Sequence, residues 1–167
     1  MSRGFVKEED QEEAPLIPPR AALPDGVTNY VTPHGFELLQ EEKKDLEQQR
    51  TSIKIKDEAE SRRAKSVIDG KLKLLNDRIA TARILDPQSH QAKDEVRFGA
   101  KVKFKQKESG EVQQFTIVGV DEADVKKKKI AFIAPIARAV TGKKIGETVE
   151  FTLGRKTRNL EILEIAY

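Results

Sequence analysis

The chain has 167 residues, of which 35% are charged and 37% are hydrophobic. These proportions indicate a small core for the length, and a solvated helical pair whose only apolar surface is its seam would account for both. The absence of cysteine excludes a disulfide scaffold and a thiolate metal site. The net charge of +3 permits contact with nucleic acid but does not argue for it, because basic and acidic residues are interspersed.

The sequence shows neither a membrane segment nor an active site of its own. No apolar run approaches membrane-spanning length and no signal peptide opens the chain, so we expect a cytoplasmic protein without membrane contact. We also expect it to be a monomer. The two histidines, His34 and His90, have no partners at the spacing of a catalytic triad or a zinc site. No glycine-rich phosphate loop is present. We therefore expect no enzyme, no catalytic residue and no metal or cofactor held by this chain alone.

Residues 1–31 are expected to form a disordered or loosely docked leader. An acidic run over residues 8–13 is followed by Pro15, Pro18, Pro19 and Pro24. Proline resists both helix and sheet, so this segment has no predicted element.

Residues 32–86 are predicted to form two helices folded back on each other as an antiparallel coiled coil. Thr32 is a good N-cap and Pro33 suits the first helical position, while the second helix must end before Asp86-Pro87. Both arms carry a stripe of residues in alternating steps of three and four, which is typical of a coiled-coil seam, although on the first arm only half of the stripe is apolar. The predicted seam pairs are Phe36 with Leu85, Leu39 with Ala82, Leu46 with Leu75, and Ile53 with Ile68.

The turn between these helices has two candidate positions. The mirror centre of the seam falls at Glu60-Ser61, which leaves Gly70 on the outer face of the second helix. Asp69-Gly70 is a common turn pair and is the rival position, although it would break the step from Ile68 to Leu72. A further alternative is that the two helices simply pack against the second domain.

Residues 96–167 change to a period of two and are predicted to form an antiparallel sheet, so the fold class is α+β. A hairpin turn is expected at residues 108–111. Residues 135–140 are predicted to form a short helix, with Pro135 in its first turn and Gly142 at its C-terminal cap. The apolar positions of the expected strands are Val102, Phe104, Phe115, Ile117, Ile130, Phe132, Val149, Phe151, Leu160 and Ile162.

Several motifs of this second domain resemble the bacterial GreA/GreB transcript cleavage and elongation factors. They occur in order at residues 98–100, 117–124, 135–139, 142–147 and 160–165. The resemblance covers roughly residues 32–167 and implies a coiled coil followed by an FKBP-like domain. It also implies that the partner is RNA polymerase, with the second domain docked at the rim of the secondary channel and the coiled coil inside it.

The resemblance also implies which residues dock on the polymerase. They are Asp121, Glu122, Ala123 and Asp124 in an acidic loop, and Pro135 and Ile136 at the short helix. The alternative for Asp121 and Asp124 is that they only shape a turn. The nearby basic run, Lys126 to Lys129, is either a solvated loop or a contact with a phosphate backbone or an acidic protein surface.

The tip of the hairpin departs from the family. Gre factors carry an acidic tip motif, Asp-x-x-Glu-Asn-Ala-acid-Tyr, whose carboxylates help to hold a catalytic magnesium of the polymerase. Here Asp57, Glu58 and Glu60 match it only in part, since the leading aspartate, the asparagine and the tyrosine are missing. The hairpin is also shorter by about fifteen residues across both arms, which removes about 11 Å of reach per arm.

Two interpretations of this tip remain. Its carboxylates can assist a magnesium ion shared with the polymerase active site, or they form an ordinary solvated tip whose charge Arg62 and Arg63 offset. The predicted function is a factor that binds RNA polymerase and modulates elongation, with or without stimulating transcript cleavage. A peptidyl-prolyl isomerase is the alternative from another class, but the second domain has no tryptophan and few aromatic residues to line its pocket.

Overall fold

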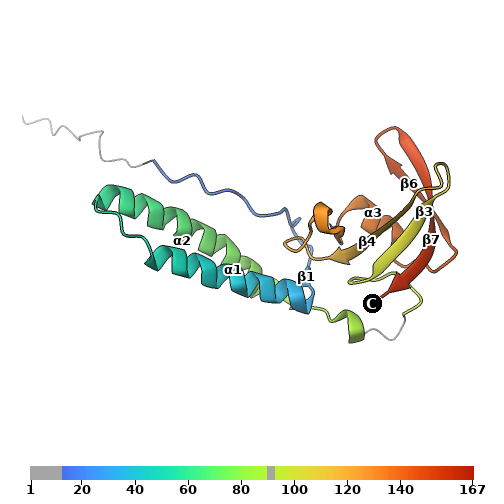
Figure 1. Cartoon of the computed structure of the whole chain (residues 1–167), viewed down its shortest axis with the longest axis horizontal. Helices are drawn as coiled ribbons and strands as arrows, with labels where there is room; N and C mark the ends of the chain where they lie inside the picture. Colours follow the sequence, from blue (N-terminus) through green and yellow to red (C-terminus); the bar gives the residue numbers. More distant parts are fainter. Residues whose placement is uncertain (1–12, 90–92) are drawn as a thin grey trace, which may run out of the picture.

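The computed structural model, which describes residues 13–89 and 93–167, consists of a helical hairpin followed by a five-stranded sheet (Figure 1). The hairpin end of the molecule contains β1 (Asn29–Val31), α1 (Pro33–Thr51), α2 (Glu58–Thr81), β2 (Ala82–Ile84) and the short helix η2 (Pro87–Ser89). The sheet domain contains β3 (Lys101–Gln106), β4 (Val112–Val118), η3 (Val125–Lys127), β5 (Lys129–Ala131), α3 (Pro135–Val140), β6 (Thr148–Leu153) and β7 (Lys156–Ala166).

The first helix begins where the sequence predicts. The Thr32 hydroxyl accepts a hydrogen bond of 2.9 Å from the Gly35 amide, and Pro33 occupies the first helical turn. This cap satisfies one of the backbone donors that have no partner at a helix start.

The predicted seam residues pack together between the two helices, except Leu85, which lies beyond β2 and outside this cluster. Leu39, Leu46, Ile68 and Leu75 form one buried cluster with Val31. Partly buried residues complete this cluster, namely Phe36, Ile53, Leu72, Ile79 and Ala82. Apolar contact along one stripe therefore holds the two helices together.

Both predicted positions of the turn are wrong. The connection runs from Ser52 to Asp57, ahead of the mirror centre at residues 60–61, and Gly70 lies inside α2. The Ser52 hydroxyl donates to the Gln48 carbonyl at the end of α1, and the Asp57 side chain accepts from the Glu60 amide at 2.9 Å. Asp57 is therefore the N-cap of α2, and the cap decides the helix start where the seam pattern does not.

The base of the hairpin contains a small sheet that the sequence did not predict. Asn29–Val31, expected in the disordered leader, form β1 and pair in parallel with β2, where helix was expected to continue at Ala82. Asn29 and Val31 are both buried, because they seal the end of the helical cluster. Within the described part of the leader, residues 13–28 have no helix or strand, as expected.

The second domain is a sheet with strand order β5-β4-β3-β7-β6. Its strands contain the predicted alternating residues, except that Phe132 lies just beyond β5. Three neighbouring pairs are antiparallel, but β5 pairs with β4 in parallel, so the prediction of a wholly antiparallel sheet is wrong. Alternation reports which face of a strand is buried but not the direction of its neighbour.

The core of this domain lies between the sheet and α3. Phe104 and Phe115 meet edge to face at 5.4 Å, and Ala137 and Val140 of α3 are fully buried against the same cluster. The predicted short helix is confirmed, and Gly142 follows it with a φ of +85°. No helix in the described ranges is both long and apolar enough to cross a membrane.

Candidate functional site

The acidic loop, residues 121–124, follows β4 and faces the base of the hairpin. The Asp121 carboxylate accepts a hydrogen bond of 3.0 Å from Nε of Arg20, and its other oxygen lies 3.5 Å from Nε of Arg78. Only 6% of the Asp121 side chain is exposed. This aspartate is therefore tied to two arginines of its own chain, and most of its surface is unavailable to a partner.

Glu122 is held in the same way. Its Oε2 accepts from the Thr32 hydroxyl at 2.7 Å, and its Oε1 accepts from Nζ of Lys129 at 3.4 Å. The side chain is 5% exposed. Because Thr32 also caps α1, Glu122 joins the sheet domain directly to the start of the hairpin.

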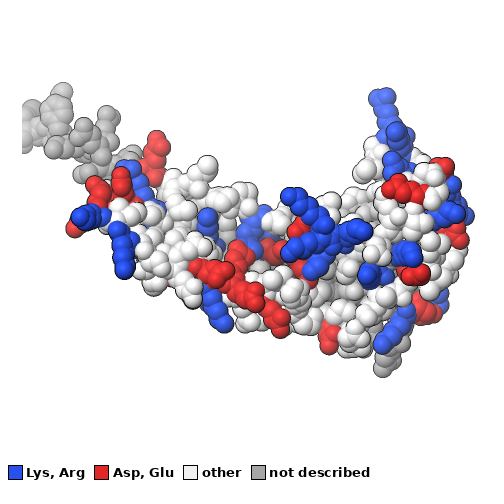
Figure 2. All heavy atoms as spheres, in the orientation of Figure 1, with Lys and Arg blue, Asp and Glu red and all other residues white. Residues whose placement is uncertain are grey.

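The other half of the loop is more open. Ala123 is exposed, and Asp124 is half-buried with its Oδ1 accepting from the Lys126 amide at 3.0 Å. Asp124 thereby caps η3, which agrees with the turn-shaping alternative for this residue. Lys126, Lys127 and Lys128 are exposed, and Figure 2 shows Lys and Arg side chains gathered where the hairpin meets the sheet domain.

A close backbone approach brings the two domains together beside this loop. A Cβ atom on Gly119 would lie 2.6 Å from the Tyr30 carbonyl oxygen, so only glycine fits there without a backbone shift. The Tyr30 ring packs edge to face on Phe132, and Phe98 packs on Phe132 in the same way, each pair at 5.7 Å. The junction is thus built from aromatic contact as well as from charge.

Pro135 and Ile136 lie in a different setting from the acidic loop. Pro135 is exposed and Ile136 half-buried, and both line a groove of about 390 Å³ against Phe151, Leu153 and Leu160. Lys156 and Arg158 of β7 also line this groove. The structure therefore divides the predicted docking set between the domain junction and an apolar groove with basic residues.

The hairpin tip lies at the end of the helices away from the sheet domain (Figure 1). Glu58 and Glu60 are exposed in the first turn of α2, whereas Asp57 uses one carboxylate oxygen as the N-cap. Side chains of both charges meet at this end in Figure 2. Within the described ranges no group of three Asp, Glu or His residues could hold a metal.

The histidines form no part of the contacts described above. His34 is exposed, 3.8 Å from Glu37, and His90 lies outside the described residues. Sequence reasoning missed Arg20 and Arg78, the two partners of Asp121. The available signal was an arginine directly after Pro18-Pro19, in a segment whose other residues are mostly small or apolar.

These features define an α+β protein in which a helical hairpin with exposed carboxylates at its tip is joined to a sheet domain. A family model described as "Transcription elongation factor, GreA/GreB, C-term" matches residues 91–167. Transcription elongation factor GreA of Thermodesulfovibrio yellowstonii is 34% identical, over 82% of this chain and 96% of its own length. GreA of Rhizobium leguminosarum bv. trifolii is 33% identical with the same coverage. The chain belongs to the GreA/GreB family of transcription elongation factors.

Solved structures with detectable likeness carry related names. The crystal structure of GreA factor homolog 1 (Gfh1) of Thermus thermophilus aligns with 84% of this chain and 100% of its own, at 20% identity and a TM-score of 0.39. The GreA/GreB elongation factor from Nitrosomonas europaea aligns with 84% of this chain and 99% of its own, at 20% identity and a TM-score of 0.41.

Proposed function

We propose that this protein binds RNA polymerase at its secondary channel and modulates elongation from the tip of the hairpin. The sheet domain supplies the affinity and the hairpin supplies the reach. The factor has no active site of its own, and it acts as a monomer in the cytoplasm, where it also contacts nucleic acid of the transcription complex. In this proposal the hairpin is a supercoiled coiled coil and the sheet domain is FKBP-like.

The position of the tip carries this proposal. The 24 residues of α2 span about 36 Å, and Glu58 and Glu60 are exposed at the end of the molecule away from the sheet domain. A narrow, mostly polar rod with carboxylates at its end can enter a channel that would exclude the sheet domain. There the carboxylates can complete the coordination of a magnesium ion that the polymerase holds.

A second candidate is a channel-binding regulator that does not stimulate cleavage. Asp57 already accepts a hydrogen bond from the Glu60 amide, and among the described residues the carboxylates of Glu58 and Glu60 have no hydrogen-bond partner. The alignment with the Thermodesulfovibrio relative spans 152 positions but 82% of this chain, about 137 residues, so about fifteen positions lack a counterpart here. Both observations support a tip that reaches less far and offers fewer ligands.

The burial of the acidic loop refines the proposed docking surface. Asp121 and Glu122 are engaged within the chain, so we assign them the role of holding the loop in place. Ala123 and Asp124, with Pro135 and Ile136, are the members of the predicted set with exposed surface.

Binding to purified core polymerase tests this surface. Ala123→Arg places a long charged side chain on the exposed part of the loop, and we expect it to weaken binding about tenfold, or about 1.4 kcal/mol. Ala166→Arg, at an exposed position of β7, is the matched control and should change the affinity less than about twofold. Equal affinities of the two variants would exclude the loop, and absence of binding by the wild type would remove the proposal.

A further inference from the structure

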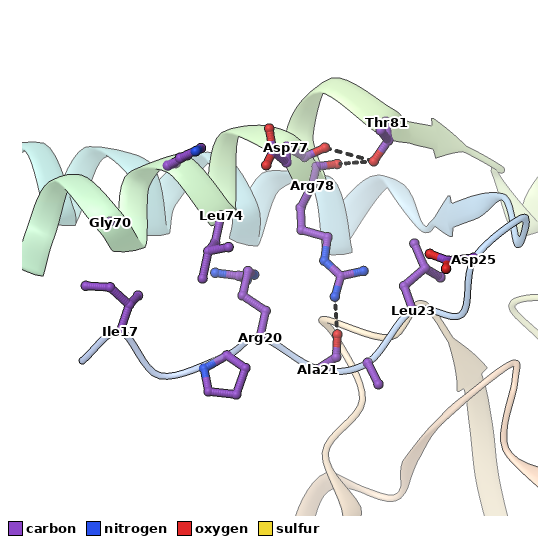
Figure 3. A pocket seen from close by; sticks show the side chains of 13 residues that line it. Ile17, Arg20, Ala21, Leu23, Asp25, Gly70, Leu74, Asp77, Arg78 and Thr81 are labelled. Atoms are coloured by element: carbon purple, nitrogen blue, oxygen red, sulfur yellow. Dashed lines mark hydrogen bonds between the residues drawn. The ribbon is translucent and has the colours of Figure 1, made fainter. Parts of the chain in front are cut away.

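Residues 13–28, here called the strap, contain no helix or strand, and from Ile17 onward they lie along α2 (Figure 3). Ile17 sits against Gly70, where an added Cβ would come within 2.5 Å of the Ile17 Cδ1 atom. Gly70 therefore forms a notch that receives the isoleucine. The strap thus covers α2 at Gly70.

Arg20 of the strap joins the two domains. Its Nη1 and Nη2 donate to the two carboxylate oxygens of Glu42 on α1, at 2.7 and 3.0 Å. Its Nε donates to Asp121 of the sheet domain at 3.0 Å. The planar fork of a guanidinium suits such a bidentate pair and fixes its direction. These partners raise the pKa of Arg20 above its ordinary value, chiefly through the hydrogen bond to Glu42.

Arg78 of α2 reinforces the same connection. Its Nη2 donates to the carbonyl of Ala21 in the strap (Figure 3). Its Nε lies 3.5 Å from the Asp121 carboxylate. The side-chain amide of Asn29 donates to the Arg78 carbonyl at 3.0 Å, just beyond the end of the strap. The strap is thus attached to α1, to α2 and to the acidic loop.

We propose that the strap is a clamp that fixes the angle between the hairpin and the sheet domain, with Arg20 as its positioning residue. Near the start of α1 the junction is held by Thr32 with Glu122 and by the Tyr30 ring on Phe132. Arg78 contacts the same Asp121 carboxylate as Arg20. Arg20 adds a contact at Glu42, more than two helical turns along α1 from Thr32. The four prolines in residues 15–24 restrict the unbound strap, which lowers the entropy cost of docking it.

The absence of native cysteine makes the angle measurable on the full chain. Glu47→Cys on α1 and Arg155→Cys, between β6 and β7, introduce two exposed sites for nitroxide labels. Pulsed electron paramagnetic resonance then gives the distribution of distances between the domains. We expect one narrow distribution in the parent and a distribution at least twice as broad, or displaced, after Arg20→Ala. The inference concerns the free protein and does not depend on polymerase binding.

Arg50→Ala is the matched control, because Arg50 forms its ion pair with Asp69 inside the hairpin at 2.6 Å. Arg50→Ala should leave the distribution of distances between the two labels unchanged. Gly70→Ala is a second test, since its added Cβ displaces the Ile17 side chain while improving the helix propensity of α2, and it should also broaden the distribution of distances. An unchanged distribution after Arg20→Ala would overturn the clamp. If Arg20→Ala fails to fold by circular dichroism, Gly70→Ala decides by the same criterion.

Discussion

Replacing Leu75 by alanine is expected to lower the free energy of unfolding by about 3–4 kcal/mol. Leu75 is 0% exposed and lies at the centre of the cluster between α1 and α2. The change removes apolar contact and leaves a cavity that a two-helix hairpin has few other side chains to fill. Urea unfolding followed by far-ultraviolet circular dichroism would measure the loss.

Leu38→Ala is the matched control for this prediction. Leu38 lies on α1 but is 39% exposed, so its truncation should cost less than about 1 kcal/mol. Equal losses for the two leucines would contradict the assignment of the seam, because truncating the buried leucine should cost far more than truncating the exposed one.

The second large effect is expected from Asp121→Ala, which should reduce stability by about 3 kcal/mol. The substitution leaves Arg20 and Arg78 facing each other with no carboxylate between them, and their side chains are only 18% and 12% exposed. Asp121→Asn should recover part of the loss, since the amide oxygen still accepts from Arg20. Thermal unfolding of the full chain at fixed pH and salt would measure both variants.

Asp124→Ala is the control that shows whether any substitution in the acidic loop lowers stability as much as Asp121→Ala does. It removes a cap of the short helix η3 and should cost about 1 kcal/mol. If Asp121→Ala is no more damaging than Asp124→Ala, the Arg20–Asp121–Arg78 cluster does not stabilise the junction. A polymerase-binding defect of Asp121 variants should therefore be interpreted only after their stability is known.

The hairpin was largely predictable because its signals are local or periodic. Thr32-Pro33 marks the start of α1, and the three-four steps identify Leu39, Leu46, Ile68 and Leu75, which are all buried. The turn was misplaced because the seam continues through Ile53 beyond the end of α1. The capping pattern of Asp57 with Glu60 was the local signal that could have placed it.

Features that depend on distant residues were not predictable from this sequence. Three-residue strands such as β1 and β2 carry too little pattern to be recognised, and they form because they seal the hairpin base. The parallel pairing of β5 with β4 follows from the path of the chain through η3 rather than from alternation.

In the candidate site, too, local features were predictable and contacts between distant residues were not. Residue types and order identified the acidic loop and the tip, which the structure places at opposite ends of the hairpin. The burial of Asp121 and Glu122 could not be foreseen, because their partners Arg20 and Thr32 lie 101 and 90 residues away in sequence. An arginine in a proline-rich segment belongs to no periodic pattern, so its contact with Asp121 could not be predicted.

The most direct test of the proposed function follows RNA length in stalled and backtracked complexes of purified RNA polymerase. The wild-type factor is compared with a Glu58→Ala/Glu60→Ala variant, which leaves the Asp57 cap of α2 intact. We predict that the wild type binds and changes the RNA products over time, and that the variant binds with equal affinity but loses this change. Shortened transcripts would favour assisted cleavage, and altered extension alone would favour the channel-binding regulator. RNA products that are identical with and without the bound wild-type factor would contradict the proposal that the hairpin tip modulates elongation.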